Sequence, residues 1–385
     1  MIRTAAGAGR FRRGRECGRT GVSVALAFFL FAGMFACRPA EKAGARKIFG
    51  VKIYEAPKNT AALFHEWASL GINTALVSET LLADDAFRSA ARKSGVALYI
   101  IFPVFQNPEE LAAQPDLAAI TAGGEPARED WVQFVCPTRD EIRARRIDRV
   151  KKLVAAYHPD GVSLDFIRFF VFWEMVQPDR APESLPQTCF CSSCLGDFQK
   201  TQNVRIPENL SGTAETARWI LANKLPEWTA WKCGVIASMV KDLVEAARSI
   251  EPGLKINVHT VPWRKEDFGG AIETIAGQDL ARIGGLVDYL SPMCYHHMVG
   301  RPPDWIHDVV RDVFDRSRIG VLPSIQVDKA YVEKDLSTAE FEAALAEALK
   351  PPSRGVLLWN WAALERSPEK QRVVRSFFRP SSSPN

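Results

Sequence analysis

The chain of 385 residues lacks several features that would identify other classes of protein. Beyond its N-terminal segment it has no apolar run of the roughly 20 residues that a membrane-spanning helix needs. It also lacks excess charge of one sign: six arginines and Glu16 give residues 1–36 a net charge of +5, whereas the whole chain carries +4, which leaves about −1 for the rest. A nearly neutral body excludes the electrostatic attraction on which nucleic-acid binding depends. The hydrophobic fraction of 47% and charged fraction of 24% exclude disordered and fibrous proteins.

The apolar run that the chain does have, residues 21–36, follows the arginines and ends in small residues, as in a secretory signal peptide. The motif Met34-Phe-Ala-Cys37 resembles a bacterial lipobox, which implies removal of residues 1–36 and lipidation of Cys37. An ordinary signal peptide and an uncleaved anchor are the alternatives. Acyl chains on Cys37 would attach the protein to a membrane without spanning it. We therefore expect a lipid-anchored protein of the bacterial cell envelope, with residues 38–46 as a polar tether.

The remaining chain alternates short apolar runs with amphipathic helical segments. β-Branched and aromatic runs predict eight strands: Ile48–Ile53, Thr74–Val77, Ala97–Phe102, Val162–Phe166, Lys255–His259, Val287–Met293, Gly320–Ile325 and Gly355–Trp359. Helical periodicity predicts helices between them, including Ala61–Leu70, Asp84–Ser94, Asp140–Tyr157, Thr213–Ile250, Pro303–Asp315 and Thr338–Leu349. Strict alternation implies parallel strands joined by right-handed crossovers.

Eight such repeats over about 330 residues predict an α/β fold, a (β/α)8 TIM barrel with enlarged βα loops. An open doubly wound sheet is the alternative, but no Gly-rich phosphate loop follows the first strand. No linker divides the chain, so we expect one barrel over residues 47–378 and a disordered tail over residues 379–385.

Barrel enzymes carry their active sites at the C-terminal ends of the strands. The residues predicted there are Tyr54, Glu55, Glu79, Asp165, Arg168, His259, Trp263, Tyr295, His296, Gln326, Asp328, Trp359, Asn360 and Trp361. Aromatic rings suit the C–H faces of sugars, and polar groups suit their hydroxyls. This mixture favours a carbohydrate-binding cleft, although an ordinary polar rim with packed tryptophans is the alternative.

The fourth predicted strand carries the most informative motif, His158-Pro-Asp-Gly-Val-Ser-Leu-Asp-Phe-Ile-Arg-Phe169. It places Asp165 at the end of an apolar strand, where a buried carboxylate is costly unless it is used or paired. Arg168, three residues later, could form a structural ion pair with it.

This motif resembles a signature of bacterial glycoside-hydrolase-like barrels, including the family-10-like group. Asp288-Tyr-Leu-Ser-Pro-Met-Cys-Tyr295 and Gly355-Val-Leu-Leu-Trp-Asn-Trp361 resemble later strands of the same group. The resemblance implies the fold more firmly than the reaction. A chitinase assignment is rejected, because Ser163 and Ile167 replace acidic residues of the chitinase motif.

Glycosidase chemistry needs two carboxyl groups beside the scissile bond. Asp165 is the first candidate, and Asp328 after the seventh strand is the natural partner because strands four and seven face each other across a barrel. Glu79 and Glu55 are the other possible partners. Arg168, His259, Tyr295 and Asn360 would then orient sugar hydroxyls.

A cysteine cluster is the sharpest local motif. Thr188-Cys-Phe-Cys-Ser-Ser-Cys194 brings three thiols together, and Cys136 of the preceding loop could supply the fourth ligand of a tetrahedral zinc ion. The set Cys136, Cys189, Cys191 and Cys194 is similar to the zinc site of family-42 β-galactosidases, although the Asn-Glu motif of that family is absent here. The resemblance implies a structural zinc without a catalytic role. Disulfides are the alternative in an exported protein.

We therefore predict a glycoside hydrolase that acts on a polysaccharide or oligosaccharide and uses Asp165, with no organic cofactor. A non-catalytic carbohydrate-binding barrel is one alternative. A metal-dependent hydrolase or deacetylase using His259, His296 and His297 is another. Nothing in the sequence indicates an oligomeric state.

Overall fold

A sheet of parallel strands organises the part of the chain that the structure, a computed structural model, describes: residues 46–379. The predicted signal peptide, Cys37, most of the tether and residues 380–385 lie outside the described residues. The sheet strands are β1 (Ile48–Ile53), β2 (Thr74–Val77), β3 (Ala97–Pro103), β6 (Gly161–Asp165), β7 (Lys255–Thr260), β8 (Tyr289–Pro292), β9 (Gly320–Val321), β10 (Ser324–Gln326) and β11 (Gly355–Trp359).

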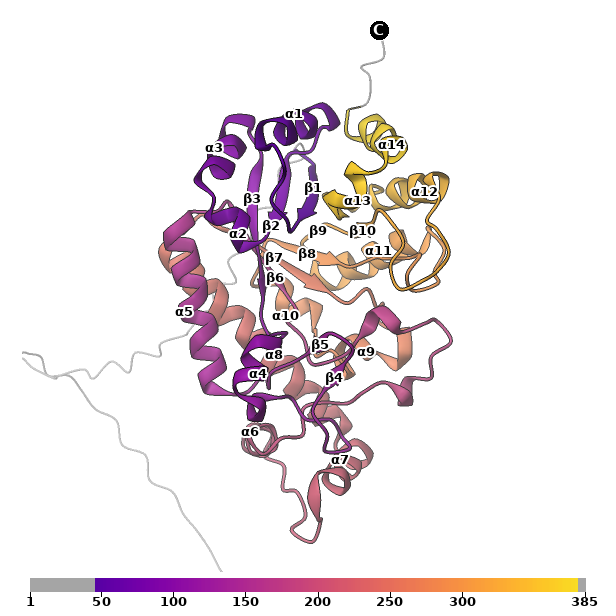
Figure 1. Ribbon diagram of the computed structural model, residues 1–385. Coiled ribbons are helices and arrows are strands. Elements are labelled where there is room, and N and C mark those ends of the chain that lie inside the picture. The colour runs from indigo at the N-terminus through magenta and orange to yellow at the C-terminus, as the bar shows by residue number, and fades with distance from the viewer. Residues whose placement is uncertain (1–45, 380–385) are drawn as a thin grey trace, which may run out of the picture. The chain divides into compact units, whose positions relative to one another are not determined.

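These nine strands form one sheet in the order β10-β11-β1-β2-β3-β6-β7-β8-β9, and every neighbouring pair is parallel. The last strand, β11, pairs with the first, β1, so the sheet curls (Figure 1) rather than reversing its order as a doubly wound sheet does. The two ends of the order, β9 and β10, are separated in the chain only by Leu322 and Pro323. The fold is therefore an α/β architecture with a curled parallel sheet.

Helices connect successive strands and cover the outside of the sheet (Figure 1). The α-helices are α1 (Thr60–Leu70), α2 (Glu79–Ala83), α3 (Asp85–Ser94), α4 (Pro108–Ala113), α5 (Asp140–Tyr157), α6 (Ser192–Gln202), α7 (Gly212–Asn223), α8 (Leu225–Ile250), α9 (Ala271–Thr274), α10 (Leu280–Gly284), α11 (Trp305–Ser317), α12 (Thr338–Ala348), α13 (Trp361–Glu365) and α14 (Pro368–Phe378). Short 3₁₀ turns are η1 (Pro115–Leu117), η2 (Trp173–Met175), η3 (Pro182–Ser184) and η4 (Asp267–Gly269). None of the helices in residues 46–379 is both long and apolar enough to cross a membrane.

The connections after β3 and β6 are the longest and gather at one end of the sheet (Figure 1). They contain α4, α6, α7 and a small hairpin of β4 (Arg128–Glu129) and β5 (Val132–Gln133). These segments follow the C-terminal ends of their strands, which is where the enlarged loops were predicted.

The strands form because their apolar residues are buried on both faces of the sheet, as is typical of parallel sheets. All four residues of β2 and all five of β6 are buried. The predicted bounds of β1, β2 and β11 and of α5 agree with the structure.

Proline accounts for two differences from the predicted elements. The helix predicted over residues 213–250 is two helices, α7 and α8, because Pro226 lies in the first turn of α8, where proline is favoured. The strand predicted over residues 320–325 is interrupted at Pro323, which has no N–H to donate to a ladder. β9 consequently pairs with β8, and β10 pairs with β11.

Gly161, the first residue of β6, allows a close approach between two strands. A Cβ at this position would lie 2.3 Å from the Tyr99 ring and 2.8 Å from the carbonyl oxygen of Lys255. We expect Gly161→Ala to lower the free energy of unfolding by about 1–3 kcal/mol, the usual cost of overpacking. Gly253→Ala is the matched control because a Cβ there meets nothing within 4 Å, and it should change stability by less than about 0.5 kcal/mol. Urea denaturation of both variants checks this, and equal effects would contradict the close approach.

Candidate active site

A cavity of about 970 Å³ opens at the C-terminal ends of the strands. Residues from the ends of β1, β2, β3, β6, β8 and β11 line it. Its volume is near the upper end of the range typical of ligand pockets. It is therefore large enough for a sugar chain of more than one residue.

Asp165 ends β6 and lines this cavity, although only 7% of its surface is exposed. Its Oδ1 accepts a hydrogen bond from the N–H of Phe166 at 2.8 Å. Burial alone would raise the pKa of Asp165, but Lys52, Arg168, the Phe166 N–H and, when it is protonated, His259 outweigh burial and lower the pKa. Burial holds the pKa of His259 at about 3, so this imidazole is uncharged at neutral pH. Lys52 and Arg168 are therefore the cations that keep Asp165 ionised.

Lys52 is the fifth of the six residues of β1 and lines the cavity with 1% of its surface exposed. Its Nζ lies 3.9 Å from Oδ2 of Asp165 and donates to the Tyr295 hydroxyl at 3.5 Å. Burial lowers the pKa of Lys52, while the charges of Asp165 and Glu174 act against that shift. The lysine thus lies in the electrostatic field of two carboxyl groups.

Glu174 is the second of those carboxyl groups. It lies in η2, lines the cavity and is 8% exposed. Burial raises its pKa to about 7, and the negative charge of Asp165 adds to the effect of burial while Arg168 opposes it. Its Oε2 is buried and has no hydrogen-bond partner within the described residues. Glu174 can therefore hold a proton at neutral pH and has an oxygen free to donate it.

The segment from Asp165 to Glu174 carries both carboxyl groups and is attached to the loops that follow β7. The N–H of Phe169 donates to the carbonyl of Ala276 at 2.9 Å, and Nε2 of Gln278 donates to the carbonyl of Ile167 at 3.1 Å. Gln278 also accepts from the N–H of Val261 at 3.0 Å. These bonds hold the backbone between the two carboxyl groups in one path.

The structure brings half of the predicted rim residues to the cavity: Tyr54, Glu79, Asp165, Arg168, Tyr295, Trp359 and Asn360. Tyr295 and Trp359 stack with ring centroids 4.7 Å apart. Glu79 forms an ion pair with Arg149. Arg168 lies over the rings of Phe134 and Phe166 at 5.2 Å from each centroid. Glu55 and Trp361 line a smaller neighbouring cavity instead.

Asp328, the predicted partner of Asp165, does not line the main cavity. Its side chain is 49% exposed and lies 3.7 Å from the Arg366 guanidinium. The reason is local: the backbone turns after β10, so that the neighbouring Gln326 donates to the Asp328 carbonyl and the carboxylate accepts from the N–H of Lys329. Trp263, His296 and Gln326 are buried away from the cavity lining.

His259 serves a polar network inside the sheet rather than the cavity surface. Ser291 donates to Asn257, Asn257 donates to Ser163, and Ser163 lies 3.1 Å from Nε2 of His259. His297 binds Glu340 and the Lys334 carbonyl. In residues 46–379 the only metal-capable group of three or more His, Cys, Asp or Glu side chains is the cysteine cluster, so the structure does not bring together the histidines of the alternative metal site.

Two residues that sequence reasoning missed, Lys52 and Glu174, complete the charged centre of the cavity. The sequence marks both residues, because each is a single charged residue in an apolar run. Lys52 interrupts the apolar strand Ile48–Ile53, and Glu174 is the one charged residue in the apolar run 169–176. A lone charge in an apolar run is costly to bury unless it is used or paired.

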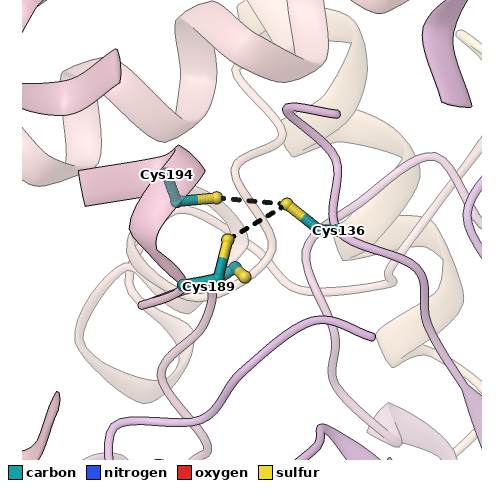
Figure 2. Close-up of side chains that lie close together, drawn as sticks. Cys136, Cys189 and Cys194 are labelled. Atoms are coloured by element: carbon teal, nitrogen blue, oxygen red, sulfur yellow. Dashed lines mark hydrogen bonds between the residues drawn. The ribbon is translucent and has the colours of Figure 1, made fainter. Parts of the chain in front are cut away.

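The four cysteines converge as predicted. The Sγ atoms of Cys136, Cys189, Cys191 and Cys194 lie within 4.8 Å of one another. Cys136 lies 3.4 Å from Cys191 and 3.5 Å from Cys194, and Figure 2 shows the last pair joined across two separate segments. All six cysteines in the described residues are free thiols. The cluster could hold a metal ion, because tetrahedral Zn–S bonds of about 2.3 Å would place sulfurs about 3.8 Å apart.

No protein-family model and no curated protein match this sequence. Solved structures do match its fold. The glycoside hydrolase domain of PgaB (BpsB) from Bordetella bronchiseptica has a TM-score of 0.66 at 12% identity, over 87% of this chain and 100% of that domain. A β-galactosidase from the psychrophilic Marinomonas ef1 has a TM-score of 0.63 at 13% identity, over 86% of this chain and 59% of that one. Gan42B, a GH42 β-galactosidase from G. stearothermophilus, has a TM-score of 0.58 at 11% identity, over 87% and 57%.

These structural neighbours are glycoside hydrolases, and the similarity shows that this chain shares their α/β barrel-like fold. The chain spans the whole PgaB domain but little more than half of either β-galactosidase. Sequence identities of 10–13% establish a shared fold, but they do not establish which reaction this chain catalyses.

The Lys52–Asp165 pair can be tested without knowledge of a substrate. Lys52→Met leaves a buried carboxylate without its nearest cation, and we expect a loss of about 3 kcal/mol in the free energy of unfolding at pH 7. The double variant Lys52→Met/Asp165→Asn should recover much of that loss, because a neutral amide needs no counter-charge. Chemical denaturation of the two single variants and the double variant measures the coupling. Strictly additive losses would show that the pair does not interact.

Proposed function

We propose that the protein is a glycoside hydrolase in which Asp165 and Glu174 are the two catalytic carboxyl groups. One observation carries this proposal: two buried carboxyl groups line one cavity, and their surroundings displace their pKa values in opposite directions. Pairs of titratable groups separated in this way identify an acid and a base. The glycoside hydrolases among the structural neighbours support the same class of reaction.

In this proposal the protonated Glu174 donates its proton to the glycosidic oxygen as the bond to the leaving sugar breaks. The ionised Asp165 acts on the opposite side, either on the anomeric carbon or on a water molecule that attacks it. Lys52 and Arg168 hold Asp165 ionised, and Arg168 orients the segment between the two groups. The substrate is an oligosaccharide or polysaccharide, because the cavity extends well beyond the two carboxyl groups.

We also propose that the curled parallel sheet closes into a complete barrel. β9 and β10 act as one strand position, which makes eight positions and closes the sheet into a (β/α)8 barrel. Isolated parallel bridges from Met293 to Ser324 and from Val321 to Ser353 support closure at this point. Residues 47–378 then constitute a single barrel domain.

We also propose that residues 1–36 are a signal peptide and that Cys37 carries lipid, which would place the barrel at the bacterial cell envelope near extracellular polysaccharide. The arginine-rich start, the apolar run and the lipobox-like motif support this placement.

The catalytic assignment predicts distinct defects for the two carboxyl groups. Glu174→Gln should lower turnover of natural glycosides by about 10²- to 10⁴-fold, the usual contribution of a general acid. It should lower turnover of 4-nitrophenyl glycosides much less, because nitrophenolate leaves without a proton. Asp165→Asn should abolish turnover of both. In the wild type, kcat/KM should fall as pH rises above about 7, where Glu174 loses its proton, and Glu174→Gln should lack this fall.

A screen of 4-nitrophenyl glycosides and soluble polysaccharides with purified protein supplies the substrate for these assays. Asp328→Asn separates the present assignment from the partner that the sequence suggested: a loss of turnover in this variant equal to that of Glu174→Gln would contradict the role of Glu174. Binding of polysaccharide by the wild type and by Asp165→Asn, with no turnover by either, would favour the non-catalytic binding barrel.

For the cysteine cluster we propose a structural zinc held by Cys136, Cys189, Cys191 and Cys194. Four thiolates leave zinc no open position for water, so the ion would fasten the loop after β3 to the loop after β6 and take no part in catalysis. We expect one equivalent of zinc by elemental analysis of the purified protein.

Cys194→Ser should lose the metal and several degrees of Tm, whereas Cys233→Ser, a buried thiol outside the cluster, should keep the metal. Retention of a full equivalent by Cys194→Ser, or a Cys194–Cys136 disulfide found by mass spectrometry, would reject the zinc proposal.

A further inference from the structure

Four aromatic side chains cluster beside the carboxyl groups, and all of them except Phe172 line the cavity. They are Trp131, Phe166, Phe172 and Tyr331, and they come from three segments that are far apart in the sequence. Trp131 lies in the two-residue turn between β4 and β5, the two phenylalanines lie within the segment from Asp165 to Glu174, and Tyr331 lies in the loop after β10. Because aromatic side chains from three separate loops contact one another, they form a defined surface.

The contacts within this group are specific. Trp131 Nε1 donates to the Tyr331 hydroxyl at 2.6 Å. The Trp131 ring lies edge to face with Phe166 and Phe172, at 6.0 Å from each centroid. Phe172 and Tyr331 make a further edge-to-face contact at 5.5 Å. These geometries are the favourable ones for aromatic pairs, so the rings hold one another in place.

The two outer rings are nevertheless exposed to solvent. Trp131 is 40% exposed and Tyr331 is 44% exposed. Of the six exposed large hydrophobic side chains in residues 46–379, three line this one cavity, namely Trp131, Tyr331 and Tyr54. Large apolar surface left in solvent and concentrated at a cavity marks a ligand-binding site.

We propose that Trp131 and Tyr331 form a platform that binds a pyranose ring of the substrate chain by stacking, at a subsite away from the bond that is cleaved. The proposal rests on the glycosidase function proposed above and narrows its substrate to a chain of several sugars. A pyranose is the occupant because the platform is continuous with the catalytic cavity and because its rings offer faces for C–H groups and a hydroxyl for hydrogen bonds.

The position of the platform gives it a consequence for catalysis. Phe166 follows Asp165 directly, and Phe172 is two residues before Glu174. The Trp131 and Tyr331 rings of the platform therefore contact the same segment that carries both carboxyl groups. Binding energy obtained there, remote from the reacting bond, can be used to position the chain over the carboxyl groups.

The test measures affinity against chain length in the full-length protein with the Asp165→Asn substitution, so that no ligand is consumed. Isothermal titration would use cello-, xylo-, galacto- and chito-oligosaccharides of two to six sugars. For the series that binds, we expect affinity to rise about tenfold between the shortest and longest members. Adding Trp131→Ala should remove that rise and leave the affinity for the shortest binding member unchanged.

Tyr331→Phe and Ile250→Ala complete the set. Tyr331→Phe keeps the ring but loses the hydrogen bond from Trp131, so the increase of affinity with chain length should be only partly lost. This conservative variant tests the platform even if Trp131→Ala misfolds. Ile250, exposed at the end of α8, lies outside the cavity lining, so Ile250→Ala should keep the full rise.

The outcomes separate the platform from the proposed function. A loss of affinity in Trp131→Ala that is equal for short and long chains, or no loss at all, would overturn the platform even if the wild type hydrolyses glycosides. A length-dependent loss in a protein whose wild type hydrolyses nothing would support the platform and count against the glycosidase. No binding of any series by the parent variant would overturn the platform.

Discussion

The ion pair between Lys52 and Asp165 is the interaction on which the site depends. An ammonium group and a carboxylate lie 3.9 Å apart inside the sheet, one on β1 and one at the end of β6, and both are almost fully buried. Each charge would be very costly in that position alone. Lys52 and Arg168 lower the pKa of Asp165, and the negative charge of Asp165 adds to burial, which is the main cause of the raised pKa of Glu174. Burial and these charges together leave one cavity with two carboxyl groups whose pKa values are shifted in opposite directions.

The strands and the long connections position this pair and enclose the cavity around it. The parallel strands deliver Lys52, Asp165 and Tyr295 to one interior because neighbouring strands end at the same edge of the sheet. The long connections after β3 and β6 form the walls, and the four-cysteine cluster joins those two connections at one point. Glycoside hydrolases of very different sequence share the same frame. What is particular to this chain is the set of side chains inside it.

Sequence patterns predicted the strands well because a strand buried on both faces must be a continuous apolar run, and Asp165 stood out at the end of such a run. They also grouped the cysteines, because Cys189, Cys191 and Cys194 are close in the sequence and Cys136 lies in the loop after the preceding predicted strand. They missed Glu174, whose approach to Asp165 depends on the irregular path of residues 166–173. They favoured Asp328, which the turn after β10 directs to solvent. The conformation of a loop determines the positions of both Glu174 and Asp328, and neither apolar periodicity nor strand order predicts that conformation.

In the proposed glycosidase, the hydrogen bonds that tie residues 167 and 169 to residues 276 and 278 would have a stereochemical consequence. Retaining glycosidases place their carboxyl groups about 5–5.5 Å apart and inverting enzymes about 6.5–9.5 Å apart. Here both groups lie on one continuous segment, so their separation is set by the course of that segment. That course is held by Ala276 and Gln278, which do not line the cavity. The configuration of the newly formed anomeric centre would thus be governed by residues that never touch the sugar.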